Sequence, residues 1–198
     1  MYRFDILNQL IQKHGYRRYL EIGVEGGDAV RAVRCDLKHG VDPGSTNATF
    51  QLPSDEFFAM IRPEIAYDCI FVDGMHEEEQ VMRDIHNSLA HLSEGGTIVV
   101  HDCNPPSAWH QREYEEAKQN GCRLWNGTVW RAWVRYRATR PDLSMAMVDT
   151  DWGCGLIQRG QQQCLALPSP FTYEDLEAHR AEWMNMISTA EFTARYIA

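Results

Sequence analysis

The stretch YLEIGVEGGDAV, residues 19–30, places the carboxylate of Glu21 inside an apolar run and follows it with three glycines. A strand that only fills a core has no use for that carboxylate, and glycines cost backbone entropy while adding no packing. Glycine does let another group approach the backbone closely. The stretch therefore predicts a strand, a loop against which a ligand lies, and a helix that begins near Asp28.

Outward from this stretch, apolar strands alternate with amphipathic helices. The clearest strand is YDCIFVDG, residues 67–74, and the clearest helix is residues 77–92, with its apolar side chains on one face. This alternation predicts a mostly parallel sheet that is covered on both faces. The predicted helices are residues 2–14, 28 onward, 54–61 and 77–92, and the predicted strands are 18–24, 40–42, 48–53, 67–73 and 95–102.

The second half of the chain has a different pattern, and all six tryptophans lie in it. A helix is predicted near residues 127–138. Two strands, 144–150 and 153–160, are separated by too few residues for a helical crossover, so they should pair as an antiparallel hairpin. A final helix is predicted from Tyr173.

Length and composition predict one soluble globular domain. The chain has 198 residues, of which 44% are apolar and 24% charged, and no apolar run approaches the roughly 20 residues that span a membrane. The first helix lacks the uninterrupted apolar stretch of a secretory signal, so we expect a cytoplasmic protein. The net charge of −9 argues against binding to nucleic acid or anionic lipid.

The cysteine spacing predicts neither a zinc site nor a redox motif, because no pair has the C-x-x-C pattern. In a reducing compartment we expect free thiols. The cysteines are Cys35, Cys69, Cys103, Cys122, Cys154 and Cys164.

Polar residues follow the predicted strands at their carboxyl ends. The loop 23–27 follows the first strand, Asp42 ends the second, and Asp73 ends the strand 67–73. His101 and Asp102 end the strand after that. In an open α/β sheet, ligands bind outside the carboxyl ends of the strands, so we expect these residues to share one crevice.

Two carboxylates narrow the choice of ligand. Glu21, near the end of its strand, would repel a phosphate and favour a cation. Asp42 lies 19 residues after Gly23, the distance at which an acidic residue commonly binds a pair of ribose hydroxyls. S-adenosylmethionine carries a ribose, a sulfonium and an amino group, so it fits both carboxylates.

Taken in order, these motifs resemble those of class I S-adenosylmethionine-dependent methyltransferases, closest to the small family called methyltransferase domain 24. The motifs are YLEIGVEGGDAV, GVDP, YDCIFVDGMHEEEQVMRDI and GGTIVVHD, and the likeness covers residues 16–160. It implies a doubly wound α/β fold of three layers, with a seven-stranded, mostly parallel sheet and a C-terminal antiparallel hairpin. It also implies a single domain over residues 1–198, with an N-terminal helix (1–15), a cofactor-binding half (16–102) and an acceptor-side half with the last helix (103–198).

Two features depart from the general pattern of the superfamily. Glu25 stands where a central glycine is often found, a variant associated with the smaller family. The interval from Asp42 to Tyr67 is too short for a helix, a strand and a second helix, so the helix after the second strand is predicted to be absent. The adenine contacts are therefore left open, with Asp55 as the candidate.

Carried over position by position, the resemblance assigns the cofactor-binding residues. Glu21, Gly23 and Gly27 would hold the methionine part of S-adenosylmethionine. Asp42 would bind its ribose, and Asp73 would meet its amino group or the methyl acceptor.

Methyl transfer from a sulfonium is a direct displacement, so the enzyme needs to align donor and acceptor and to deprotonate a hydroxyl. His76, His101 and a metal are the alternatives for that deprotonation, and Asp73 and Asp102 are the catalytic candidates beside them. Neighbouring residues of an extended strand point to opposite faces, so His101 and Asp102 both enter the crevice only if the chain has already turned. One of the two is expected to be structural.

The metal alternative rests on related metal-dependent O-methyltransferases. There, carboxylates after two successive strands bind magnesium, and Asp73 and Asp102 occupy similar places. The third ligand there is often an amide or carboxylate, but Cys103 follows Asp102 here, and a thiolate is a poor magnesium ligand. Asn104 or His101 would have to complete such a site.

The segment LWNGTVWRAWVRY, residues 124–136, lies where this fold usually builds its acceptor pocket. Its flat aromatic side chains and an arginine would suit a sugar or an aromatic acceptor. The candidate acceptor contacts are Trp125, Asn126, Trp130 and Arg131.

The favoured function is O-methylation of a hydroxyl on a small molecule or glycan. A NAD-type oxidoreductase is the second interpretation, since a glycine loop and an acidic strand end are shared with dinucleotide-binding folds, but Glu21 and the hairpin count against it. A non-catalytic S-adenosylmethionine-binding module is the third, and His76 and His101 count against that. Two alternatives stay open for the final helix: it covers the sheet, or it makes a homodimer contact with Trp183 and Met186.

Overall fold

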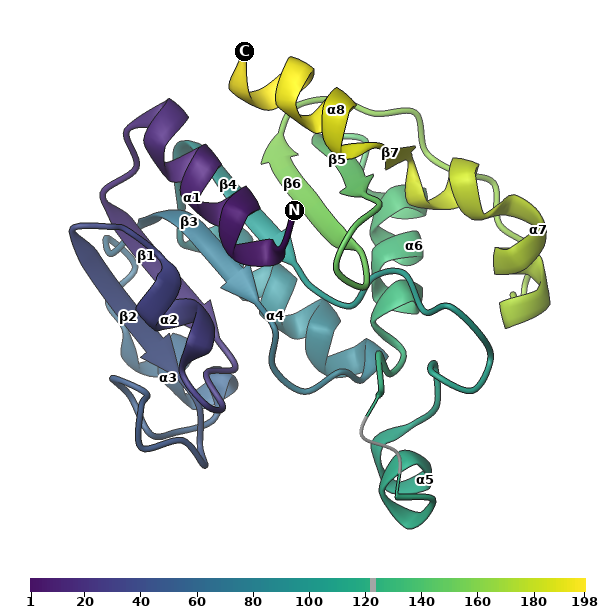
Figure 1. The fold of residues 1–198 in the computed structure, drawn as a ribbon, viewed down its shortest axis with the longest axis horizontal. Coiled ribbons are helices and arrows are strands. Elements are labelled where there is room, and N and C mark those ends of the chain that lie inside the picture. Colours follow the sequence, from purple (N-terminus) through teal and green to yellow (C-terminus); the bar gives the residue numbers. More distant parts are fainter. Residues whose placement is uncertain (122–123) are drawn as a thin grey trace.

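One sheet, built from four parallel strands and an added hairpin, organises the protein (Figure 1). The computed structural model describes residues 1–121 and 124–198, and within these residues seven strands lie in the order β2-β1-β3-β4-β6-β5-β7. The strands are β1 (Arg18–Ile22), β2 (Leu37–Val41), β3 (Tyr67–Val72), β4 (Leu92–Val100), β5 (Leu143–Val148), β6 (Cys154–Arg159) and β7 (Met186–Ile187). The helices are α1 (Arg3–His14), α2 (Asp28–Ala32), α3 (Ser54–Met60), α4 (Glu78–Ala90), α5 (Tyr114–Gln119), α6 (Val129–Thr139), α7 (Tyr173–Met184), α8 (Thr189–Phe192) and the π-helix η1 (Thr193–Ile197).

The register of the parallel strands aligns their carboxyl ends. Ile22 of β1 lies opposite Val41 of β2 and Val72 of β3. Val72 in turn lies opposite Val100 of β4. Because these four strands run in the same direction, the polar residues that follow them meet at one edge of the sheet.

β5 and β6 form the predicted antiparallel hairpin, and β6 is the strand that joins it to the parallel part, through an antiparallel ladder with β4. The turn between them uses Asp151, Trp152 and Gly153, with φ of 46°, 65° and 88°. The predicted doubly wound α/β fold, with a mostly parallel seven-stranded sheet and a C-terminal hairpin, is confirmed.

The strand predicted at residues 48–53 is wrong, and β7 takes its place in the count of seven. Only Phe50 of this segment bridges to the sheet, opposite Val41. The chain turns sharply just after β2, where the backbone N–H groups of Gly44 and Ser45 both bond to the Asp42 carboxylate. No described residue between β2 and α3 is helical, which agrees with the predicted absence of a helix after the second strand.

The final helix predicted from Tyr173 begins there as α7, but its predicted continuation to the end of the chain is wrong. α7 ends at Met184 because Asn185 adopts the left-handed conformation, with φ of 45°. β7 then pairs in parallel with β5, and the chain continues as α8 and η1. Trp183 packs edge-on against Phe171 and is only 4% exposed, so this candidate dimer contact lies inside the chain.

Apolar side chains cover both faces of the sheet, which confirms the three-layer arrangement. On one face, α3, α4, α6 and α7 contribute buried residues such as Phe57, Ile85 and Trp133. On the other face, α1, α2 and α8 contribute residues such as Leu7 and Phe192. The layers hold the strand ends in fixed positions and leave the carboxyl-end edge open.

Five cysteines are described and all are free thiols, as predicted: Cys35, Cys69, Cys103, Cys154 and Cys164. Cys122 lies outside the described residues. Among the described helices, none combines the length and apolar character needed to cross a membrane.

Substituting Gly155 tests how tightly the hairpin packs on α6. A Cβ at Gly155 would lie 2.4 Å from a ring carbon of the buried Trp133, so we expect Gly155→Ala to lower the free energy of unfolding by about 1–3 kcal/mol. Gly26→Ala is the matched control, because a Cβ there meets nothing within 4 Å. Urea unfolding measures both variants, and equal stabilities would contradict this packing.

Candidate functional site

A cavity of about 900 Å³ lies at the carboxyl ends of β1, β2, β3 and β4. Of the residues predicted to act in catalysis or to bind the methionine part or the ribose of the cofactor, only Gly27 does not line it. Gly27 instead precedes α2 with φ of 78°, and its N–H bonds to the Val24 carbonyl at 2.7 Å. The predicted site residues that line the cavity are Glu21, Gly23, Asp42, Asp73, His76, His101 and Asp102.

Gly23 allows the loop after β1 to lie directly on the end of β3. It has φ of 86°, and a Cβ there would be 2.1 Å from the Asp73 carbonyl oxygen. No side chain fits that space. The group that approaches this glycine is therefore the neighbouring backbone, which brings Glu21 and Asp73 to the same wall of the cavity.

Asp42 ties two loops together through its carboxylate. One oxygen accepts the N–H groups of Val24 and Glu25 at 3.0 and 2.9 Å, and the other accepts those of Gly44 and Ser45 at 2.8 and 2.9 Å. Burial alone would raise the pKa of Asp42, but these four N–H groups outweigh it and lower the pKa. Asp42 is therefore a fixed negative charge at the cavity wall.

Glu21 is a second carboxylate at the cavity and is only 1% exposed. The Tyr19 hydroxyl donates to it at 2.7 Å. Burial, aided by the charge of Asp73, raises the pKa of Glu21 to about 7, although the Tyr19 hydrogen bond opposes this. A cation placed beside Glu21 would stabilise its charged form.

Two carboxylates and two imidazoles form a compact cluster at the ends of β3 and β4. The Nδ1 atom of His101 lies 3.1 Å from Asp73 Oδ1 and 3.1 Å from Asp102 Oδ2. His76 lies with Nε2 3.3 Å from Asp73 and Nδ1 3.4 Å from Asp102. The two carboxylates therefore contact both rings.

Mutual attraction inside this cluster governs its charges. Burial opposes every charge in it, yet His101 and His76 outweigh burial and lower the pKa of Asp73. The carboxylates in turn raise the pKa of His101 to about 10 and raise that of His76, against the effect of burial. Asp73 and His101 are thus held in their charged forms in a largely dry setting.

His101 and Asp102 both enter the crevice, which the sequence allowed only if the chain had already turned. Asp102 has φ of 60°, so the chain has already turned after β4, and both side chains line the cavity. The buried Asn126 amide donates to Asp102 at 2.7 Å and holds it there. A left-handed aspartate is uncommon, and the sequence gives no direct sign of it.

Of the predicted acceptor contacts, Trp125 alone lines the cavity. Its ring stacks on His76 with the centroids 5.0 Å apart. Asn126 and Trp130 are fully buried, and the Arg131 guanidinium lies over the Trp130 ring. Asn126 therefore does not reach the cavity itself, and its amide holds the Asp102 side chain in place.

Two further sequence-based candidates point elsewhere. The Asn104 amide donates to Asp149 at 3.1 Å, and its oxygen accepts from Arg180 at 2.6 Å. Asp55, the candidate adenine contact, pairs with Arg83 at 3.1 Å and does not line the cavity.

The cavity residues that sequence reasoning missed include Arg3 from α1, Asp84 from α4 and Tyr114 from α5. Asp84 is 1% exposed and accepts from Ser54 at 2.6 Å and from Gln80 at 3.1 Å. A buried aspartate on the apolar face of a predicted helix was a visible signal for Asp84. Arg3 lies far from the motifs in sequence and carried no such signal.

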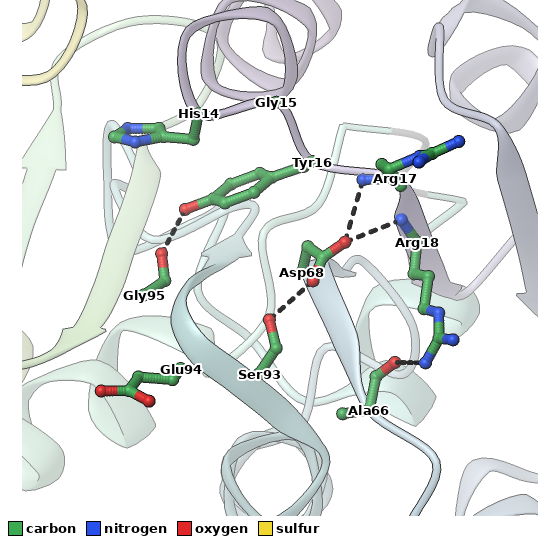
Figure 2. Close-up of a pocket in the computed structure, with 10 residues that line it drawn as sticks. All are labelled: His14, Gly15, Tyr16, Arg17, Arg18, Ala66, Asp68, Ser93, Glu94 and Gly95. Carbon is green, nitrogen blue, oxygen red and sulfur yellow. Dashed lines mark hydrogen bonds between the residues drawn. The ribbon is translucent and has the colours of Figure 1, made fainter.

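A second hollow of about 520 Å³ lies at the opposite edge of the sheet, where β1, β3 and β4 begin (Figure 2). There Asp68 accepts the backbone N–H groups of Arg17 and Arg18 at 2.9 and 3.0 Å. It also accepts from the Ser93 hydroxyl, while the Tyr16 hydroxyl donates to a backbone carbonyl. These polar groups bind one another, so they join the strand starts.

The chain matches a known family over the cofactor-side motifs. Residues 20–103 match the family model described as a methyltransferase domain, which confirms the resemblance predicted from the motifs. A search of curated proteins finds no match.

Solved structures share the fold. The O-methyltransferase from Bacillus cereus in complex with SAH has 16% identity, with 80% of each chain covered and a TM-score of 0.58. The O-methyltransferase TomG from Streptomyces achromogenes in complex with SAM, involved in tomaymycin synthesis, has 18% identity over 79% of each chain and a TM-score of 0.57. SAH-bound methyltransferase PaMTH1 from Podospora anserina has 15% identity over 80% of this chain and 78% of that one, with a TM-score of 0.56. At sequence identities this low, the structural similarity establishes the fold alone.

Asp84 should make stability depend on pH. Burial raises its pKa to about 6, so the folded protein keeps a proton that the unfolded chain loses near pH 4. The stability that protonated Asp84 contributes is therefore fully present below pH 4 and is lost as the pH rises through about 6. By pH 7 this loss lowers the free energy of unfolding by about 2 kcal/mol.

Urea unfolding at pH 4 and pH 7 checks this contribution. We expect Asp84→Asn to lose less stability than the wild type between the two pH values. Asp36→Asn, at an exposed residue outside the cavity, is the control and should follow the wild type. Identical pH dependence in Asp84→Asn and the wild type would contradict the assignment.

Proposed function

We propose that this chain, which has the fold of class I methyltransferases and matches a methyltransferase domain over residues 20–103, transfers a methyl group from S-adenosylmethionine to a hydroxyl of a small molecule or glycan. One observation carries the proposal. The glycine loop, the buried Glu21 and the cluster of Asp73, His76 and Asp102 all line a single cavity. A binding loop and a group able to take a proton thus face the same space.

The residues of the cavity fit S-adenosylmethionine. Glu21 is a buried carboxylate with no ion-pair partner among the described residues, so a ligand ammonium at Glu21 and Asp73 would compensate its charge. Asp42 stands beside the loop, where it would accept from the ribose hydroxyls. Bound S-adenosylmethionine would supply a methyl group on a positively charged sulfur.

His76 is the proposed proton acceptor. Asp73 and Asp102 lie near its two ring nitrogens, and Trp125 stacks on one side of the ring. These contacts fix the orientation of the imidazole. An acceptor hydroxyl placed beside Nε2 would give its proton to the neutral form of His76, which is present at a pH above its raised pKa, as the new bond to carbon forms. Asp73 would stabilise the resulting imidazolium.

A divalent cation is the second candidate for ionising the hydroxyl, and one observation favours it. Asp73, His76 and Asp102 each offer a ligand atom, and these atoms lie within 4.8 Å of one another. Two carboxylates and an imidazole fit manganese or zinc better than magnesium, which prefers oxygen ligands alone. A bound ion would lower the pKa of a hydroxyl that it contacts.

The finer parts of the proposal follow from charge and composition. A net charge of −9 suits a small-molecule or glycan acceptor and a cytoplasmic enzyme, and does not suit a nucleic acid or a membrane surface. Residues 16–102 would serve the cofactor and residues 103–198 the acceptor. We include a homodimer in the proposal, to be checked by light scattering.

Calorimetric titration with S-adenosylhomocysteine tests the cofactor assignment. We expect binding of S-adenosylhomocysteine and none of NAD. Glu21→Gln removes the buried charge without changing shape, so it should weaken binding by about 10-fold or more, whereas Glu25→Gln, in the exposed part of the loop, should stay within about twofold. Binding should also strengthen from pH 6 to pH 8 in the wild type, as Glu21 ionises, and stay flat in Glu21→Gln. Preference for NAD would sink the proposal.

His76→Gln tests the proton acceptor. With a panel of phenols and sugars as test acceptors, release of S-adenosylhomocysteine should fall by about 100-fold or more, while affinity for that product stays unchanged. His86→Gln, on the exposed side of α4, is the matched control and should keep full activity.

Treatment with EDTA separates the two candidates for ionising the hydroxyl. Full activity after chelation, together with loss in His76→Gln, is the expected result. Loss of activity on chelation that manganese or magnesium restores would assign the step to a cation at Asp73 and Asp102.

A further inference from the structure

Arg3 reaches the cavity from the start of α1. Its backbone N–H donates to Asp151 Oδ2 at 2.8 Å, and its Nη1 lies 3.1 Å from the same oxygen. These contacts join the start of α1 to the turn of the β5–β6 hairpin and fix the guanidinium. Arg3 also lines the cavity together with Glu21 and Gly23.

One donor of this guanidinium makes no hydrogen bond to any residue that the structure describes. Arg3 Nε is buried, and the carboxylate oxygen that it faces, on Asp73, is 3.9 Å away, within range of an ion pair but too far for a hydrogen bond. A charged donor that is buried without a hydrogen bond costs folding free energy. The ion pair with Asp151 is enough to hold the start of α1, and it leaves this cost at Nε in place. The unpartnered Nε therefore indicates that a further acceptor belongs in the cavity.

The charges around the cavity limit what that acceptor can be. Nine carboxylates line it, and the arginines among the described lining residues are Arg3 and Arg83. The imidazoles of His101 and His76 also line it, but both rings already contact Asp73 and Asp102. Arg83 is already bonded to Asp55 and to Gln80. A ligand carboxylate would be repelled almost everywhere in the cavity except beside Arg3.

We propose that Arg3 binds the carboxylate of the amino-acid end of the cofactor. This inference rests on the proposed function and deepens it. Glu21 and Asp73 lie on the same wall and would take the ammonium group of that end. An α-amino acid group carries both charges on one carbon, so the opposed charges of Arg3 and the two acids recognise it as a unit. Arg3 thereby becomes a specificity residue for ligands with an intact amino acid.

A ligand comparison isolates this contact. Decarboxylated S-adenosylhomocysteine keeps the adenosine, the sulfur and the ammonium and lacks only the carboxylate. Calorimetry should give S-adenosylhomocysteine about 10- to 100-fold tighter binding than the decarboxylated compound in the wild type, the size expected for a charge-assisted contact. In Arg3→Met that ratio should fall to within about threefold, and Arg3→Lys should keep an intermediate ratio.

Arg83→Met is the matched control, because it removes the other cavity arginine and should leave the ratio of the two affinities unchanged. A wild-type ratio near one, or the same ratio in Arg3→Met as in the wild type, would overturn the role of Arg3 while leaving the cofactor assignment intact. Binding of neither compound by the wild type would overturn the proposed function and this inference with it. If Arg3→Met does not fold, the ratio of the two affinities in the wild type and in Arg3→Lys still tests the role of Arg3.

Discussion

The contact between Gly23 and the backbone of Asp73 is the constraint on which the rest of the site depends. No Cβ fits between them, so the loop after β1 lies on the end of β3 without a spacer. That contact places the buried Glu21 close to Asp73, and Asp42 then fixes the outer part of the loop through Val24 and Glu25. Gly23, at the start of this loop, must therefore be a glycine because the backbone of Asp73 contacts it directly.

The charged side chains that line the cavity determine which ligands it can bind. Carboxylates dominate the cavity wall, and Asp73 keeps its charge because the His101 ring lies 3.1 Å from it. Such an arrangement costs desolvation that surface charges would avoid. In the proposed function, a cationic cofactor would reduce that cost on the side of Glu21, and the neutral form of His76 would accept a proton from the acceptor.

The sequence predicted those features that local pattern controls. Strand ends at Asp42, Asp73 and Asp102 follow from apolar periodicity and from the direction of parallel strands, so the shared crevice could be predicted from the sequence alone. The two misassigned elements have local causes that compete with periodicity. The Asp42 carboxylate turns the chain before residues 48–53 can extend as a strand, and Asn185 ends a helix that otherwise continues in pattern.

What the sequence could not supply are contacts between distant residues. Arg3 meets Asp151 across 148 positions, and no spacing rule connects the two. The turn at Asp102 depends on the buried Asn126 that donates to its side chain, so its backbone conformation is a tertiary effect. The residues that complete the cavity are accordingly the ones that sequence reasoning missed.

A crystal structure of the complex with S-adenosylhomocysteine tests the central claim most directly. We expect the ribose beside Asp42, the amino-acid end at Glu21 and Asp73, and the sulfur facing His76. A ligand bound at another place, or bound with its amino-acid end away from Glu21, would contradict the account.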